Sequence, residues 1–109
     1  MSASMNESCI QACSNCALAC ETCSASCLRE SDVQAMARCV ALDMDCADFC
    51  KVAATLMARG SDYAKAVCQQ CAEVCRACGE ECARHEAEHC QRCAQACRSC
   101  AEECERMAA

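Results

Sequence analysis

The residues with the clearest chemical potential are the cysteines, which make up nineteen of the 109 residues. They fall into four groups, within which successive cysteines are three, four or seven residues apart. Alternating steps of three and four place side chains on one seam of a helix that faces a partner. Each group therefore predicts one helix with its thiols directed inward. The groups are Cys9, Cys13, Cys16, Cys20, Cys23 and Cys27; Cys39, Cys46 and Cys50; Cys68, Cys71, Cys75, Cys78 and Cys82; and Cys90, Cys93, Cys97, Cys100 and Cys104.

Thiols on so many inward positions indicate a soft metal as the bound species. They replace the large apolar side chains that normally fill a core, and this exchange does little for stability. Thiolate is the ligand that Cu(I) prefers, and two or three sulfurs satisfy one ion, so thiolates at successive levels can bridge a column of ions. Because a buried thiolate must be neutralised, the sequence predicts multiple Cu(I) ions, approaching about one per cysteine.

Other uses of cysteine fit the pattern less well. Cysteines three or four apart on a helix have Cβ atoms about 5–6 Å apart, which exceeds the about 3.5–4.5 Å of a disulfide. The C-x2-C-x2-C-x3-C run of iron–sulfur proteins is absent. A thiol oxidoreductase needs one exposed cysteine in a distinct electropositive setting, whereas one environment is repeated here, so we expect no enzyme. Zinc stays open, because facing helices can supply four thiolates, and a metallothionein-like buffer for zinc or other soft divalent metals is the alternative function.

The residues around the cysteines favour helices throughout. There is no proline, only two glycines are present, and polar residues such as Gln91, Arg98 and Glu102 occupy the faces between the cysteines. The sequence predicts an all-α protein, an antiparallel up-down-up-down four-helix bundle with a cysteine-lined interior. We expect a single domain over residues 1–109, with helices near 5–28, 32–58, 62–84 and 88–107.

Local signals predict where these helices begin and end. Ser4-Met-Asn-Glu7 and Ser31-Asp-Val-Gln34 each match a capping box. Gly60 suits the residue after the end of the second helix, with Ser61 or Asp62 opening the third. The third break has no good capping residue, and we infer it because Cys90 starts a stripe out of phase with the preceding one.

Three segments resemble the cytosolic branch of the copper storage protein family. They are CQQCAEVCRACGEEC (68–82), HCQRCAQACRSCAEEC (89–104) and CADFC (46–50), and the resemblance covers nearly the whole chain. It implies a four-helix bundle, Cu(I) held inside by cysteine, and assembly of bundles into tetramers. Copper ions are then the expected cargo, and copper donor or acceptor proteins are the expected partners.

His85 and His89 lie at the predicted junction of the third and fourth helices, the end of the bundle that Met36 shares. Imidazole and thioether groups there would receive copper at a mouth before it passes inward, and the resemblance supports this role for the histidines. The alternative is a pair of solvated turn residues. We therefore predict a metal site made of all nineteen cysteines together with His85 and His89.

Other side chains continue the cysteine stripes. Met5, Met57 and Met107 do so at the opposite end, where we expect a hydrophobic plug, with soft metal ligands as the alternative. Asp43 lies on the stripe of the second helix, and we expect it to turn to solvent or to form a salt bridge, with a terminal metal ligand as the alternative.

The remaining features concern surface and surroundings. A net charge of −6 argues against binding to nucleic acid. No segment approaches the roughly 18 apolar residues of a membrane span, and the first residues lack a secretory signal, so we expect the cytosol, where thiols stay reduced. Leu42, Phe49 and Leu56 form a second apolar stripe, which predicts contact between bundles in a homo-oligomer. Burial by neighbouring helices of the same chain is the alternative.

Overall fold

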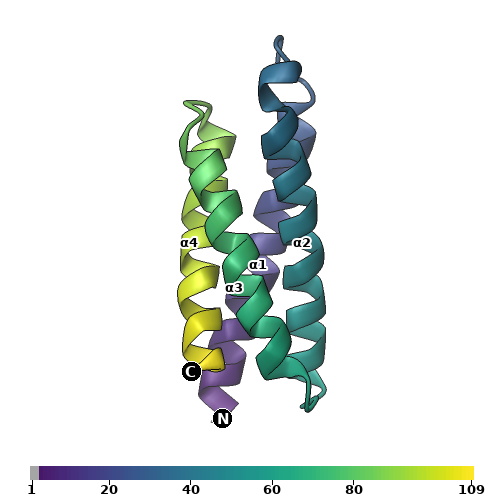
Figure 1. Ribbon diagram of the computed structural model, residues 1–109, viewed down its shortest axis with the longest axis vertical. Helices are drawn as coiled ribbons and strands as arrows, with labels where there is room; N and C mark the ends of the chain where they lie inside the picture. Colours follow the sequence, from purple (N-terminus) through teal and green to yellow (C-terminus); the bar gives the residue numbers. More distant parts are fainter. Residues whose placement is uncertain (1–2) are drawn as a thin grey trace.

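Four long helices run antiparallel and enclose one narrow interior (Figure 1). The computed structural model describes the backbone of residues 3–109 and the side chains from Asn6 onward. The helices are α1 (Ala3–Cys27), α2 (Ala37–Ala58), α3 (Ala64–Ala83) and α4 (Glu88–Ala108), and a 3-10 turn, η1 (Gln34–Met36), precedes α2. Each helix packs against the next along the chain and α4 packs against α1, which confirms the predicted up-down-up-down bundle.

The interior is narrow because small side chains fill it. The bundle measures 45 × 17 × 17 Å, and all nineteen cysteines are fully buried. Alanines beside the cysteine stripes, including Ala47, Ala53 and Ala101, are also fully buried, so the helix backbones approach closely. At Gly79 a Cβ atom would lie 3.3 Å from the Cβ of Cys97, which shows how tightly α3 and α4 pack. Within residues 3–109, no helix has the combination of length and hydropathy that a membrane span requires.

The first two helix starts differ from the predicted ones. Helix α1 begins at Ala3, so Ser4 lies inside the helix and is not its N-cap, and its side chain falls outside the described ones. Ahead of α2, Asp32 acts in place of Ser31, because its Oδ1 accepts the backbone N–H of Ala35 at 3.2 Å. The chain then makes the η1 turn, so α2 starts five residues later than expected. Aspartate and serine are similarly good capping residues, and the negative charge of aspartate also interacts favourably with the N-terminal end of a helix.

The end of α2 is a Schellman motif built on Gly60. Gly60 has φ of +66°, its N–H bonds the carbonyl of Met57 at 3.1 Å, and the N–H of Ser61 bonds the carbonyl of Leu56 at 2.9 Å. The Ser61 hydroxyl then accepts the N–H of Tyr63 at 3.1 Å, and α3 begins directly after it. The glycine predicted at this position therefore sets the reversal between α2 and α3.

The break between α3 and α4 receives its missing cap from across the turn. The Nε2 atom of Gln91, in the first turn of α4, donates to the carbonyl of His85 at 2.7 Å and to that of Ala83 at 3.3 Å. Carbonyls at a helix end have no partner within the helix and need one from elsewhere. A side chain of α4 thus satisfies carbonyl groups at the end of α3. No local capping motif in the sequence predicts this contact.

The backbone geometry at Gly60 leads to a stability prediction. Gly60→Ala should lower the free energy of unfolding by about 1–2 kcal/mol, because a Cβ is strained at positive φ. A Cβ there would meet nothing within 4 Å, so collision with neighbours is not the cause. Gly60→Asn should lose less, since asparagine tolerates this region. Urea unfolding of the reduced, metal-free variants measures both, and equal losses would contradict a backbone origin.

Candidate metal centre

The sulfur atoms form a nearly continuous column along the bundle axis. Sulfurs from different helices contact one another at 3.8 Å between Cys9 and Cys104, 3.8 Å between Cys16 and Cys46, and 3.4 Å between Cys39 and Cys82. Every cysteine is a free thiol. The seam predicted from the three-and-four spacing therefore does converge on the axis, and it does so on all four helices.

Many of these sulfurs gather in groups of four whose members all lie within 4.8 Å of one another. Five of these groups each combine three helices, and four cysteines (Cys16, Cys20, Cys46 and Cys97) each belong to two of the five. The shared members join the three central groups, so a thiolate there is placed to bridge ions at two levels. The groups are Cys13, Cys71, Cys100 and Cys104; Cys16, Cys46, Cys50 and Cys75; Cys16, Cys20, Cys46 and Cys97; Cys20, Cys78, Cys93 and Cys97; and Cys23, Cys27, Cys39 and Cys90.

Asp43 lies inside this column, which corrects the expectation that it turns to solvent or forms a salt bridge. Its side chain is 0% exposed, and its Oδ1 lies 3.1 Å from the Sγ of Cys78 and 3.3 Å from those of Cys82 and Cys93. Its position four residues after Cys39 keeps it on the inward seam, with no room to reach the surface. Burial, followed by the charge of Cys93, raises the pKa of this carboxyl to about 10. The carboxyl is therefore neutral at neutral pH.

Proton sharing among the thiols follows from their burial and contacts. Burial raises the pKa of Cys90 to about 11 and also raises that of Cys27. Deeper in the column, a hydrogen bond with Cys16 raises the pKa of Cys20, whereas hydrogen bonds from Cys100 and Cys20 lower that of Cys16. Neighbouring thiols therefore differ in proton affinity: Cys16, which accepts hydrogen bonds, loses its proton more readily than Cys20. A cation that binds here must displace these protons.

At the mouth, His89 is in direct contact with thiols. Its Nδ1 lies 3.5 Å from the Sγ of Cys23, 3.5 Å from that of Cys90 and 3.9 Å from that of Cys27. Its Nε2 lies 2.9 Å from Oε2 of Glu30, in the turn after α1. The predicted histidine at the mouth is therefore joined to the outermost sulfur group.

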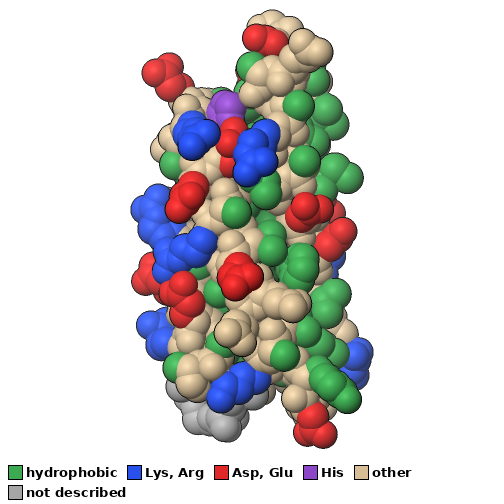
Figure 2. Space-filling model, in the orientation of Figure 1, with side chains coloured by type: hydrophobic (Ala, Val, Ile, Leu, Met, Phe, Trp, Pro, Cys, Tyr) green, Lys and Arg blue, Asp and Glu red, His purple; other side chains and the backbone are tan. Residues whose placement is uncertain are grey.

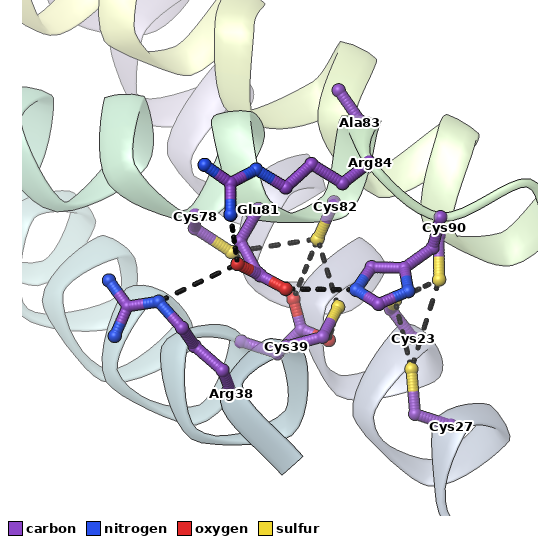
Figure 3. Close-up of polar contacts among 12 residues, drawn as sticks. Cys23, Cys27, Arg38, Cys39, Cys78, Glu81, Cys82, Ala83, Arg84 and Cys90 are labelled. Carbon is purple, nitrogen blue, oxygen red and sulfur yellow. Dashed lines mark hydrogen bonds and ion pairs between the residues drawn. The ribbon is translucent and has the colours of Figure 1, made fainter. Parts of the chain in front are cut away.

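His85 is held differently. Its Nε2 lies 2.9 Å from Oε2 of Glu81, and none of its described side-chain contacts is with a sulfur. Glu81 is only 8% exposed and also pairs with Arg38 at 3.5 Å and Arg84 at 3.7 Å. Figure 3 shows this carboxylate between the two arginines, beside Cys82. A histidine side chain and basic and acidic side chains also gather at this end of the surface in Figure 2.

Sequence reasoning missed the two glutamates that hold the histidines. Glu81 lies four residues before His85, so helical spacing alone could have indicated the pair. Glu30 lies 59 residues before His89 and reaches it only through the fold.

Buried methionines lie at both ends of the column. Met36 is 7% exposed at the mouth, whereas Met57 and Met107 are 1% and 2% exposed at the opposite end. The side chain of Met5 lies outside the described ones. The Nδ2 of Asn6 donates to the carbonyl of Met57 at 3.3 Å, which ties the start of α1 to the end of α2. Met57 and Met107 are therefore buried at this end, and the apolar plug stays a prediction.

The raised pKa of Asp43 predicts how the stability of the metal-free protein depends on pH. The folded state binds this proton more tightly than the unfolded chain, so the stabilisation is complete below about pH 4 and is lost as pH rises toward about 10. Between pH 5 and pH 8 the wild type should therefore lose up to about 1.4 kcal/mol per pH unit relative to Asp43→Asn. Urea unfolding under reducing conditions measures this. Asp45→Asn, at an exposed position of α2, is the control, and parallel profiles for wild type and Asp43→Asn would refute the prediction.

Comparisons with known proteins agree with this geometry. The sequence model of the family described as copper storage protein matches residues 2–109. The uncharacterized cysteine-rich protein YhjQ of Bacillus subtilis is 46% identical over 84 residues, which cover 77% of this chain and 78% of that protein.

Solved structures of similar proteins include copper-loaded ones. The Cu(I)-bound copper storage protein BsCsp3 is 46% identical, with a TM-score of 0.93 over 96% of this chain and 99% of that one. A cytosolic copper storage protein from Streptomyces lividans, with five coppers, is 44% identical, with a TM-score of 0.93 over 96% of this chain and 92% of that one. A bundle with this sulfur column, matched over nearly its full length, belongs to the copper storage protein family.

Proposed function

We propose that this protein stores Cu(I), binding many ions through the thiolates inside its bundle. The observation that carries the proposal is the column of free, fully buried thiols in groups of four that share members. Cu(I) needs only two or three sulfurs, so bridging thiolates can serve ions at adjacent levels. The copper-loaded relatives support the same cargo for this chain.

Charge balance favours Cu(I) over a divalent ion such as zinc. Zinc in a structural site takes four ligands, and four thiolates around one Zn²⁺ leave two negative charges without compensation in the core. One Cu(I) for each thiolate leaves the core neutral. Arg38 and Arg84 at the mouth already pair with Glu81, so their charges are not free to compensate an anionic site. Zinc buffering is therefore the less favoured function.

The proposed ligands are the nineteen cysteines, with histidines at the mouth. His89 contacts three thiols through Nδ1 and is placed to bind the first ion of the column. His85 lies farther out, paired with Glu81, and we assign it to the reception of copper at the same mouth. Asp43 adds one oxygen donor within the column.

We infer that the role is storage without catalysis, in the reducing environment of the cytosol. No cysteine side chain is exposed, which is opposite to what a thiol-based enzyme needs. The Streptomyces lividans relative is described as cytosolic, which supports the same location here. Copper would then reach and leave the mouth by exchange with donor and acceptor proteins.

We further propose that the bundles form a homo-oligomer, as a tetramer, through the outer face of α2. Phe49 and Leu56 are only partly covered by their own chain, and Met44 and Val52 on the same helix are 56% and 49% exposed. Apolar side chains line the α2 edge of the bundle in Figure 2. An apolar strip on an acidic surface is typical of a contact between protein subunits.

Copper capacity tests the storage proposal. Anaerobic titration of the reduced protein with Cu(I), against a competing chelator, should reach about one ion per cysteine, with about one proton released per ion. A parallel titration with Zn²⁺ should saturate at about one quarter of that number. Saturation with one or two Cu(I) ions would rule out storage.

Sedimentation tests the oligomer. The double variant Phe49→Glu, Leu56→Glu should reduce the mass of the wild-type assembly to that of one chain, because charges would then be buried in the contact. Leu18→Glu, at a residue of α1 that is 68% exposed, is the matched control and should leave the mass unchanged. An unaltered mass in the double variant would place the contact elsewhere.

A further inference from the structure

The two ring nitrogens of His89 face chemically different groups. Nε2 lies 2.9 Å from the carboxylate of Glu30, and Nδ1 lies 3.5 Å from the sulfurs of Cys23 and Cys90. A neutral imidazole carries one proton and has one free lone pair, whereas a carboxylate can only accept. The proton therefore belongs on Nε2, and the lone pair of Nδ1 faces the thiols.

We propose that Glu30 is a positioning residue, which fixes the tautomer and orientation of His89 so that Nδ1 is presented to the outermost thiols. The inference rests on the proposed copper function, since its purpose is to prepare Nδ1 as the first nitrogen ligand of the column. Carboxylates that bond the outer nitrogen of a metal-binding histidine commonly have this role.

The surrounding structure supports a dedicated contact. Glu30 is anchored beside the thiols, because its N–H bonds the carbonyl of Cys27 at 3.1 Å. The contact with Glu30 adds a polar anchor on Nε2 to the contacts that Nδ1 makes with Cys23 and Cys27 of α1, so both ring nitrogens of His89 are held. The side chains of His89 and Glu30 are 18% and 39% exposed, so an arriving ion can reach them.

The second histidine shows that this arrangement is specific to His89. His85 makes the same 2.9 Å contact from Nε2 to a glutamate, but Glu81 divides its charge among His85, Arg38 and Arg84. Among the described ion pairs, Glu30 has His89 as its partner. Only in His89 does the opposite nitrogen contact sulfur among the described side chains.

The test uses nitrogen NMR of the full-length, reduced, metal-free protein labelled with 15N-histidine, at a pH where the spectrum shows neutral rings. Wild type should show His89 only as the Nε2–H tautomer. Glu30→Gln should retain it, because the amide oxygen still accepts the proton. Glu30→Ala should show a mixture with the Nδ1–H form. Glu86→Ala, which removes an exposed carboxylate from the turn between α3 and α4, is the charge-matched control. A His89 spectrum unchanged in Glu30→Ala would overturn the proposal.

A second readout separates positioning from storage itself. Transfer of the first Cu(I) equivalent from a chelator, followed by stopped flow, should slow about 10-fold in Glu30→Ala, and stay near wild type in Glu30→Gln and Glu86→Ala. Total capacity should be the same in all four proteins. A tautomer change without a slower first step would refute the link to copper. If the wild type itself bound only one or two Cu(I) ions, the storage function would be refuted. The NMR result would still decide whether Glu30 fixes the tautomer of His89.

Discussion

The core of this protein is constrained by the cost of burying ionisable sulfur. Nineteen thiols share an interior of small side chains, and a thiolate there is tolerated only with a cation or a proton beside it. Protons meet this need in the metal-free state, as the raised pKa values of Cys90 and Asp43 indicate. A monovalent soft cation such as Cu(I) neutralises a thiolate equally well, because each ion carries one positive charge for each negative sulfur. The same constraint makes the core a store for Cu(I) and disfavours anionic four-thiolate sites.

A sulfur-filled core contributes less apolar burial than one of leucine, so the fold depends more on other contacts. The Schellman motif at Gly60, the Gln91 side chain that closes α3 and the Asp32 cap ahead of α2 secure the three connections. Close approach of the backbones, seen where Gly79 meets Cys97, recovers packing that larger side chains would supply. Bound copper adds stability because the unfolded chain lacks the preformed site.

The two ends of the bundle differ, and the difference gives the column a direction. Met57 and Met107 close one end with buried apolar side chains. The other end presents two histidines, each held by a glutamate. The ligand atoms therefore change from hard oxygens at the surface, through imidazole nitrogens of intermediate softness, to soft sulfurs in the interior. Under the proposed function, ions that enter at this end would meet nitrogen and sulfur together before they reach sulfur alone.

The cysteine spacing by itself determined the helices, their inward seams and the soft-metal chemistry, because helical periodicity is a local property of the chain. It placed Asp43 on the seam, but only the packed structure decided that the carboxyl stays inside among Cys78, Cys82 and Cys93. It also placed His89 at the mouth, whereas its contact with Glu30 depends on how the turn after α1 meets the start of α4. Contacts between residues far apart in the chain are set by turn geometry and helix packing, and no periodic pattern encodes them.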